Sequence, residues 1–119
     1  MSLRPALALS ALFVFVAGFE HARLFHRGYE QVEVIGPLFL LNGVASAAVV
    51  LLLVFGRSRL FVVGALAIAV PSLIAIAISH FGSLLGWEEG GFDVDAIVIV
   101  AAELLATVLA LVGAREARA

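Results

Sequence analysis

Residues 37–55 read PLFLLNGVASAAVVLLLVF, a run of 19 positions without a charged side chain. An α-helix rises about 1.5 Å per residue, so this run would be roughly 28 Å long, close to the ~30 Å thickness of the hydrocarbon layer of a bilayer. Asn42 and Ser46 are its polar side chains. The stretch therefore predicts a transmembrane helix with a small polar patch.

Three further stretches are also predominantly apolar and long enough to span a bilayer, at residues 5–25, 60–80 and 94–113. The segments between the four stretches carry Gly and charge and are predicted to be turns. Pro5 and Pro37 would occupy the first helical position of their helices, where a missing N–H costs nothing. Pro71 falls in the middle of the third stretch and predicts a kink that opens space inside the bundle.

The whole composition agrees with this pattern. The chain of 119 residues is 64% hydrophobic and 13% charged, with a mean hydropathy of +1.20, against roughly 45–50% apolar and about 25% charged in soluble domains. We therefore expect one all-α domain over residues 1–119, a four-helix transmembrane bundle. The absence of cysteine excludes disulfides and thiolate metal sites. The net charge of −2 argues against a nucleic-acid partner, and no motif of an ordinary hydrolase or kinase is present.

The arginines predict the orientation. Five of them fall on one side of the predicted bundle and two on the other, so the five-arginine side is expected to be cytoplasmic. The five are Arg4, Arg57, Arg59, Arg115 and Arg118. Arg23 and Arg27 belong to the opposite side. Both chain ends would then lie in the cytoplasm of a bacterium, with the protein in the plasma membrane.

Polar side chains within the predicted helices gather at one depth. An ionisable group in hydrocarbon costs at least about 2.5–3.5 kcal/mol, so such groups usually face the bundle interior. The polar groups are Glu20, His21, Asn42, Ser46, Ser79, His80, Glu103 and Thr107. Counted from the outer helix ends at the helical rise, Glu20, His21, Asn42 and Glu103 lie roughly 8–13 Å deep, and His80 is a little shallower. All four helices thus contribute to one polar layer in the outer leaflet.

A metal or a haem is our first interpretation of this layer. His21, His80 and Glu103 could ligate a divalent transition metal, because imidazole and carboxylate oxygen suit such ions. Alternatively, His21 and His80 could be the axial ligands of a b-type haem. Arg23 or Arg27 would then reach the haem propionates. Either cofactor would make this a redox or metal-handling membrane protein.

Other interpretations use the same residues. The layer could bind a quinone, a lipid or another small amphipathic molecule, with His, Asn and Glu contacting its head group. Glu20 and Glu103, with the kink at Pro71, could serve a proton-coupled carrier. The polar groups could also simply join helices, at roughly 0.6 kcal/mol and up to about 2 kcal/mol per contact. A further possibility is that the chain is an accessory subunit of a membrane complex.

Glu20 and Gly43 have simpler local explanations. Glu20 points about a hundred degrees away from His21 on a helix, and its nearest partner is Arg23 at i+3. Gly43 and Ala47 form a small-x-x-x-small pattern, which favours close helix contact within the chain or in a homodimer.

Two stretches resemble a known group. They are EHARLFHRGY at residues 20–29 and IGPLFLLN at residues 35–42. They resemble small uncharacterised actinobacterial membrane proteins with a His-rich end of helix one, a group loosely similar to the DoxX-like four-helix proteins. This resemblance covers about the first half of the chain and implies a fold but no activity. The chain also resembles the small multidrug resistance transporters in size and in a first-helix glutamate, Glu20.

Overall fold

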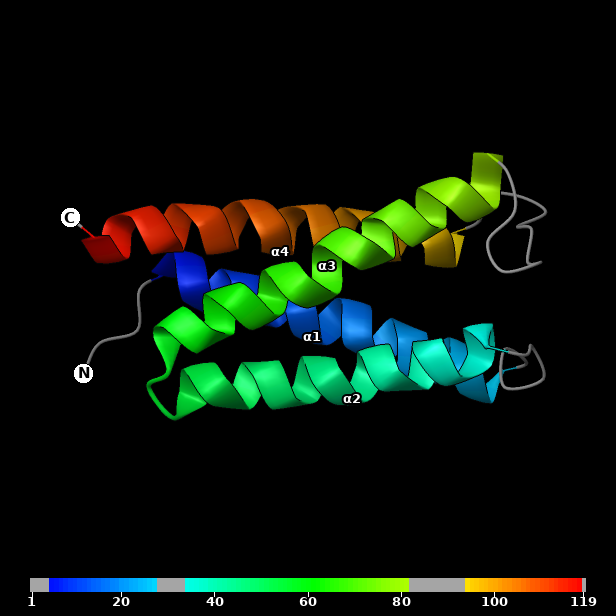
Figure 1. Ribbon diagram of the computed structural model, residues 1–119, viewed down its shortest axis with the longest axis horizontal. Coiled ribbons are helices and arrows are strands. Elements are labelled where there is room, and N and C mark those ends of the chain that lie inside the picture. Colours follow the sequence, from blue (N-terminus) through cyan, green and yellow to red (C-terminus); the bar gives the residue numbers. More distant parts are fainter. Residues whose placement is uncertain (1–4, 28–33, 82–93, 119) are drawn as a thin grey trace.

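Four antiparallel helices make up the described part of the molecule. The structure, a computed structural model, describes residues 5–27, 34–81 and 94–118, and for residues 79–81 and 116–118 it describes the backbone alone. The helices are α1 (Pro5–His26), α2 (Ile35–Val54), α3 (Ser58–Phe81) and α4 (Val94–Arg118). They run alternately up and down, so both chain ends lie at one end of the bundle (Figure 1). All four are long and apolar enough to cross a membrane, which confirms the all-helical prediction.

The helix starts show why the proline positions are tolerated. α1 begins at Pro5, as predicted. α2 begins at Ile35, two residues before the predicted start at Pro37. Its first hydrogen bond runs from the amide of Leu38 to the carbonyl of Val34. The missing amide of Pro37 therefore still falls in the first turn, where no intrahelical acceptor exists.

A short turn joins α2 to α3 at the end that carries the chain termini. Gly56 adopts a φ of 78°, a conformation that costs glycine little because it has no Cβ. Its amide donates to the carbonyl of Leu53, and the amide of Arg57 donates to that of Leu52. This pattern is a Schellman motif, which satisfies the last carbonyls of α2 and reverses the chain within a few residues.

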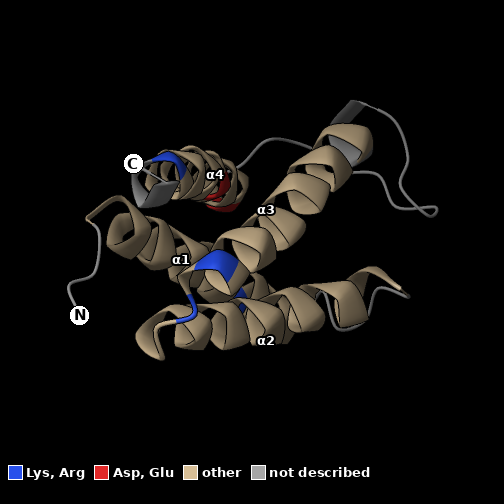
Figure 2. Ribbon diagram, turned by 60° about the vertical axis from the view of Figure 1, so that its left-hand side comes forward, with Lys and Arg blue, Asp and Glu red and all other residues tan. Residues whose placement is uncertain are grey.

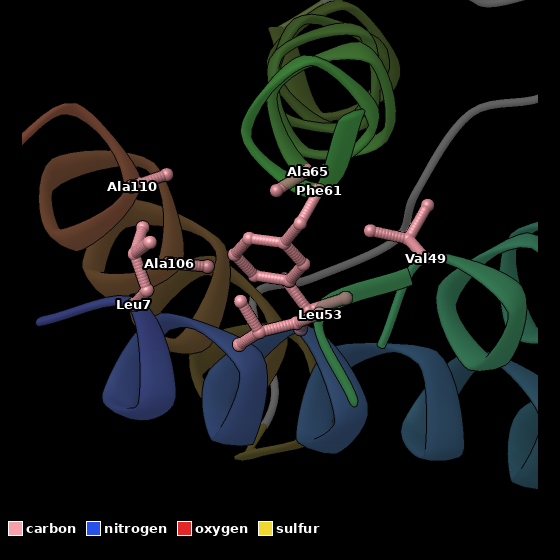
Figure 3. Packing of buried hydrophobic residues seen from close by; sticks show 8 residues of the cluster. Leu7, Val49, Leu53, Phe61, Ala65, Ala106 and Ala110 are labelled. Atoms are coloured by element: carbon pink, nitrogen blue, oxygen red, sulfur yellow. The ribbon is translucent and has the colours of Figure 1, made fainter. Parts of the chain in front are cut away.

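Helix α1 lies at the centre of the packing. It contacts α2 and α4 extensively and α3 only slightly, whereas α3 packs between α4 and α2. One apolar cluster draws on all four helices, with Phe61 of α3 completely buried in it (Figure 3). Leu7, Leu53 and Ala110 place this cluster in the half of the bundle near the chain ends. The predicted polar residues lie mostly in the other half.

Small residues allow α1 and α2 to touch. A Cβ added to Gly18 would lie 2.4 Å from Cβ of Ser46, and one added to Gly43 would lie 3.0 Å from Cβ of Ala22. Gly43 therefore contacts α1 of the same chain, whereas Ala47 is exposed. The small-x-x-x-small pattern of α2 was predicted to favour helix contact within the chain or in a homodimer. At Gly43 it makes the contact within the chain.

The exterior of the bundle is apolar, unlike that of a soluble protein. Among the described residues, the buried polar or charged ones are Ser10, His21, Ser46 and Glu103. Large apolar side chains cover the outside, among them Phe15, Phe19, Leu41, Val63 and Val108. This is the distribution expected for helices whose surroundings are hydrocarbon, because only the interior offers hydrogen-bond partners.

Candidate functional site

A cleft lies between α2 and α3. The two helices diverge away from the turn that joins them (Figures 1 and 2), and a cavity of about 410 Å³ occupies the space between them. Its walls come from α2, α3 and one residue of α1. The apolar lining residues are Ile35, Leu38, Phe39, Leu41, Ala45, Ala67, Ile68, Pro71 and Ala75, and the polar ones are His21, Asn42 and Ser72.

Pro71 lies at the middle of the α3 wall. α3 continues through Pro71 as one helix, although the proline ring removes a hydrogen-bond donor and crowds the carbonyl four residues before it. Residues on both sides of Pro71, from Ala67 to Ala75, line the cleft. The cavity therefore lies at the level of Pro71, whereas the kink that was predicted to open this space stays a prediction.

His21 reaches the cleft from α1. It is 4% exposed, and its Nδ1 lies 2.8 Å from the carbonyl oxygen of Ala17, one turn earlier. Its ring meets the ring of Phe39 edge-on, with centroids 4.9 Å apart. Because a carbonyl can only accept, Nδ1 carries the hydrogen in this contact, and in the neutral ring Nε2 holds a lone pair.

Asn42 and Ser46 lie one turn apart on α2. The hydroxyl of Ser46 donates to Oδ1 of Asn42 over 3.3 Å. Ser46 is buried against Gly18 of α1, whereas Asn42 lines the cleft. With Oδ1 engaged as an acceptor, the amide nitrogen of Asn42 remains as a donor group.

Ser72 connects the cleft to a deeper carboxyl group. Its hydroxyl donates to Oε1 of Glu103 over 2.8 Å. Glu103 is 1% exposed and does not line the cleft, but lies behind Ser72 beside a separate void of about 10 Å³. Its Oε2 is the one buried side-chain oxygen or nitrogen in the described residues without a hydrogen-bond partner. Thr107 donates to the main-chain carbonyl of Glu103, not to its side chain.

A second charged group lies outside the cleft. Arg23 Nη2 contacts Oε2 of Glu20 at 2.7 Å and Oδ1 of Asp95 at 2.5 Å, and its Nε contacts Oε1 of Glu20 at 3.1 Å. The predicted pairing of Glu20 with Arg23 is confirmed. The contact with Asp95 ties α1 to α4 and was not predicted.

The predicted metal and haem residues are described only in part. His21 lines the cleft, Glu103 lies behind Ser72, and His80 belongs to the last turn of α3 with its side chain outside the described residues. Among the described side chains, no three of His, Asp or Glu come together as metal ligands. Arg23 is occupied by two carboxylates and Arg27 is exposed at the end of α1. Pairing of His21 with His80 stays a prediction.

Ser72 and Ser10 were missed by the sequence reasoning. Ser10 is buried, and its hydroxyl donates to the main-chain carbonyl of Ala106 over 2.7 Å. Serine is common in transmembrane helices, so a single one gives little signal. Ser72 follows a proline in a helix interior, and this position is a signal in the sequence. Hydroxyl groups often bond to the backbone groups that such a proline leaves without a partner.

Comparison of the chain with protein-family models, curated proteins and solved structures finds no match. The resemblance to DoxX-like proteins therefore stays a prediction.

Proposed function

We propose that this chain is a multi-pass protein of the bacterial plasma membrane, with both ends in the cytoplasm, whose α2–α3 cleft binds a small amphipathic molecule such as a quinone or a lipid. The cleft carries the proposal. Its volume of about 410 Å³ lies within the roughly 300–1,000 Å³ typical of small-molecule sites. Apolar walls with a few polar groups are also typical of such sites.

The position of the cleft favours entry from the bilayer. Leu38 is 44% exposed and Leu41 is 60% exposed, and both belong to the lining. The rim of the cleft is thus part of the apolar exterior of the bundle. An amphipathic molecule dissolved in lipid could move into the cleft without crossing water, and its head group would meet His21, Asn42 and Ser72.

Saturable photolabelling tests this proposal. The purified protein is reconstituted in lipid nanodiscs with a diazirine-bearing quinone or a diazirine-bearing lipid, and the labelled residues are mapped by mass spectrometry. We expect labelling in residues 35–45 and 67–75 that an excess of unlabelled ligand abolishes. Ala45→Phe, which fills the cleft, should reduce it strongly, whereas the matched control Ala48→Phe on the exposed face of α2 should not. Labelling spread evenly over all lipid-facing positions would reject the proposal.

A haem or metal ion is a second candidate, favoured by one contact of His21. Metal-bound histidines usually donate their other ring N–H to a carbonyl or carboxylate, and Nδ1 of His21 makes this bond with Ala17. His80 would be the second ligand. An absorption spectrum and elemental analysis of the purified protein, compared with His21→Ala and His80→Ala, decide this candidate. A reduced b-type spectrum or stoichiometric metal lost in both variants supports it, and a colourless, metal-free wild-type protein rejects it.

A further inference from the structure

The hydrogen bonds that the polar side chains of the cleft already make determine which groups of a ligand these side chains can still bind. Within the described residues, His21 and Asn42 each make one side-chain hydrogen bond, to Ala17 and Ser46 respectively. The first bond uses the N–H of His21 and leaves Nε2 as an acceptor. The second uses the oxygen of Asn42 and leaves its NH₂ group as a donor. The cleft therefore offers one acceptor and one donor from two different helices.

Ser72 adds a weaker acceptor. Its only hydrogen is directed to Oε1 of Glu103, so the hydroxyl can accept from a ligand but cannot also donate to it. Two of the three polar groups of the cleft are thus acceptors. A head group that only accepts hydrogen bonds would leave both of them unpaired.

The lack of charged side chains among the described lining residues also limits which ligands the cleft can bind. None of the described residues that line the cleft is an arginine, an aspartate or a glutamate. Arg23, the nearest arginine along α1, is held by Glu20 and Asp95. An anionic head group would meet no arginine among the described residues that line the cleft, and an uncompensated charge is costly away from water.

We propose, resting on the proposed function, that the cleft selects an uncharged amphipathic molecule with a hydroxyl group that donates to Nε2 of His21 and an oxygen that accepts from Asn42. Two sources share this chemistry: a hydroquinone and a lipid alcohol such as a monoacylglycerol. A quinone has only acceptors and satisfies Asn42 but not His21. Phosphatidylglycerol bears a charge and is disfavoured.

Competition against the photoreactive lipid tests the selectivity. Four competitors are compared under argon in zwitterionic nanodiscs: a decyl-substituted benzohydroquinone, its quinone, monoolein and phosphatidylglycerol. We expect the hydroquinone, monoolein or both to compete about tenfold more strongly than the quinone and phosphatidylglycerol, the factor that corresponds to roughly 1.4 kcal/mol for one hydrogen bond. The stronger of the two hydroxyl-bearing competitors identifies the source of the ligand.

Variants separate this inference from the proposed function. His21→Phe keeps a ring beside Phe39 but removes Nε2, so it should make hydroquinone and quinone compete equally while labelling of the cleft persists. His26→Phe, an exposed position on the same helix, should leave the preference intact. Thermal unfolding of each variant shows whether the bundle still forms. If neither the hydroquinone nor monoolein competes more strongly than the quinone in the wild-type protein, or if phosphatidylglycerol competes most strongly, the selectivity is overturned but the cleft stands as a binding site. Absence of saturable labelling in the wild-type protein would overturn both.

Discussion

Gly18 shows how one residue sets the distance between two helices. Its missing side chain lets the backbone of α1 lie against Ser46 of α2. In the same way, Gly43 lets the backbone of α2 lie against Ala22 of α1. Lipid tails are as apolar as leucine, so helices in a membrane associate through close packing and hydrogen bonds. A methyl group at Gly18 would remove this contact.

We therefore predict that Gly18→Ala destabilises the bundle by about 1–3 kcal/mol, the usual cost of overpacking. The added Cβ would lie 2.4 Å from Cβ of Ser46 and 2.7 Å from its hydroxyl oxygen, so the helices must separate. The measurement is the free energy of unfolding in mixed micelles with increasing dodecyl sulfate. Ala8→Leu, on the exposed face of α1, is the control and should change little. Unchanged stability of Gly18→Ala would mean that α1 and α2 are farther apart.

Arg23 supports a second prediction at the residue scale. Its side chain is 31% exposed and that of Asp95 is 33% exposed, so solvent weakens their attraction. A double-mutant cycle with Arg23→Gln and Asp95→Asn should give a coupling energy of about 0.2–1 kcal/mol that falls with added salt. Arg59→Gln, at the opposite end of the bundle, should be additive with Asp95→Asn. A coupling above about 2 kcal/mol would mean that the pair is shielded from water.

At the scale of the elements, α3 decides whether the cleft exists. The first turns of this helix contribute Phe61 and Ala65 to the apolar cluster (Figure 3), whereas residues between Ala67 and Ala75 line the cleft. Pro71 lies in the middle of this lining part, and Ser72 follows it directly. The same helix therefore holds the bundle together at one end and opens it at the other.

Pro71→Ala should stabilise α3 and narrow the cleft. The substitution restores an amide that can bond to the carbonyl of Ala67 and removes the clash of the ring, which together cost up to about 3 kcal/mol in a helix interior. We expect a higher melting temperature by circular dichroism and weaker saturable labelling. Val70→Ala, the exposed neighbouring residue, is the control. If labelling by the quinone probe stays at the wild-type level while the melting temperature rises, Pro71 does not shape the cleft.

At the scale of the whole molecule, the two ends of the bundle differ in the number of arginines they carry. Arg57, Arg59 and Arg115 are exposed at the end where the chain begins and ends, and basic positions are visible there in Figure 2. Arg23 and Arg27 lie at the opposite end. Positive residues are retained on the cytoplasmic side of a membrane, so this asymmetry predicts the orientation.

Cysteine labelling checks the orientation directly, because the chain contains no cysteine. Val34→Cys places a single thiol just before α2, at the end of the bundle opposite the chain ends. Ser58→Cys places one at the start of α3, at the end that carries the chain ends. In spheroplasts, an impermeant maleimide should label Val34→Cys at once and Ser58→Cys only after the membrane is permeabilised. The reverse pattern would place both chain ends outside the cell, and labelling of both variants would indicate mixed insertion.

The sequence by itself predicted the four helices and most of their ends to within two residues, because each apolar stretch meets these conditions locally. The exception is α4, which continues to Arg118 beyond its predicted end at residue 113. The sequence also predicted the depth of the polar residues and the pairing of Glu20 with Arg23, since a fixed helical rise and spacing determine both. The partner of Glu103 needed the tertiary structure. Ser72 and Glu103 lie on different helices, and spacing along one helix does not determine how it is rotated against its neighbours.

The same reason applies to the predicted ligands. His21 and Glu103 were expected to share a centre because their depths agree; His21 lines the cleft and Glu103 lies behind Ser72, and the shared centre stays a prediction. The contact of Arg23 with Asp95 likewise joins residues 72 positions apart. Depth in the bundle follows from the distance along a single helix, whereas the neighbours of a side chain depend on the packing of all four helices, which only the tertiary structure decides.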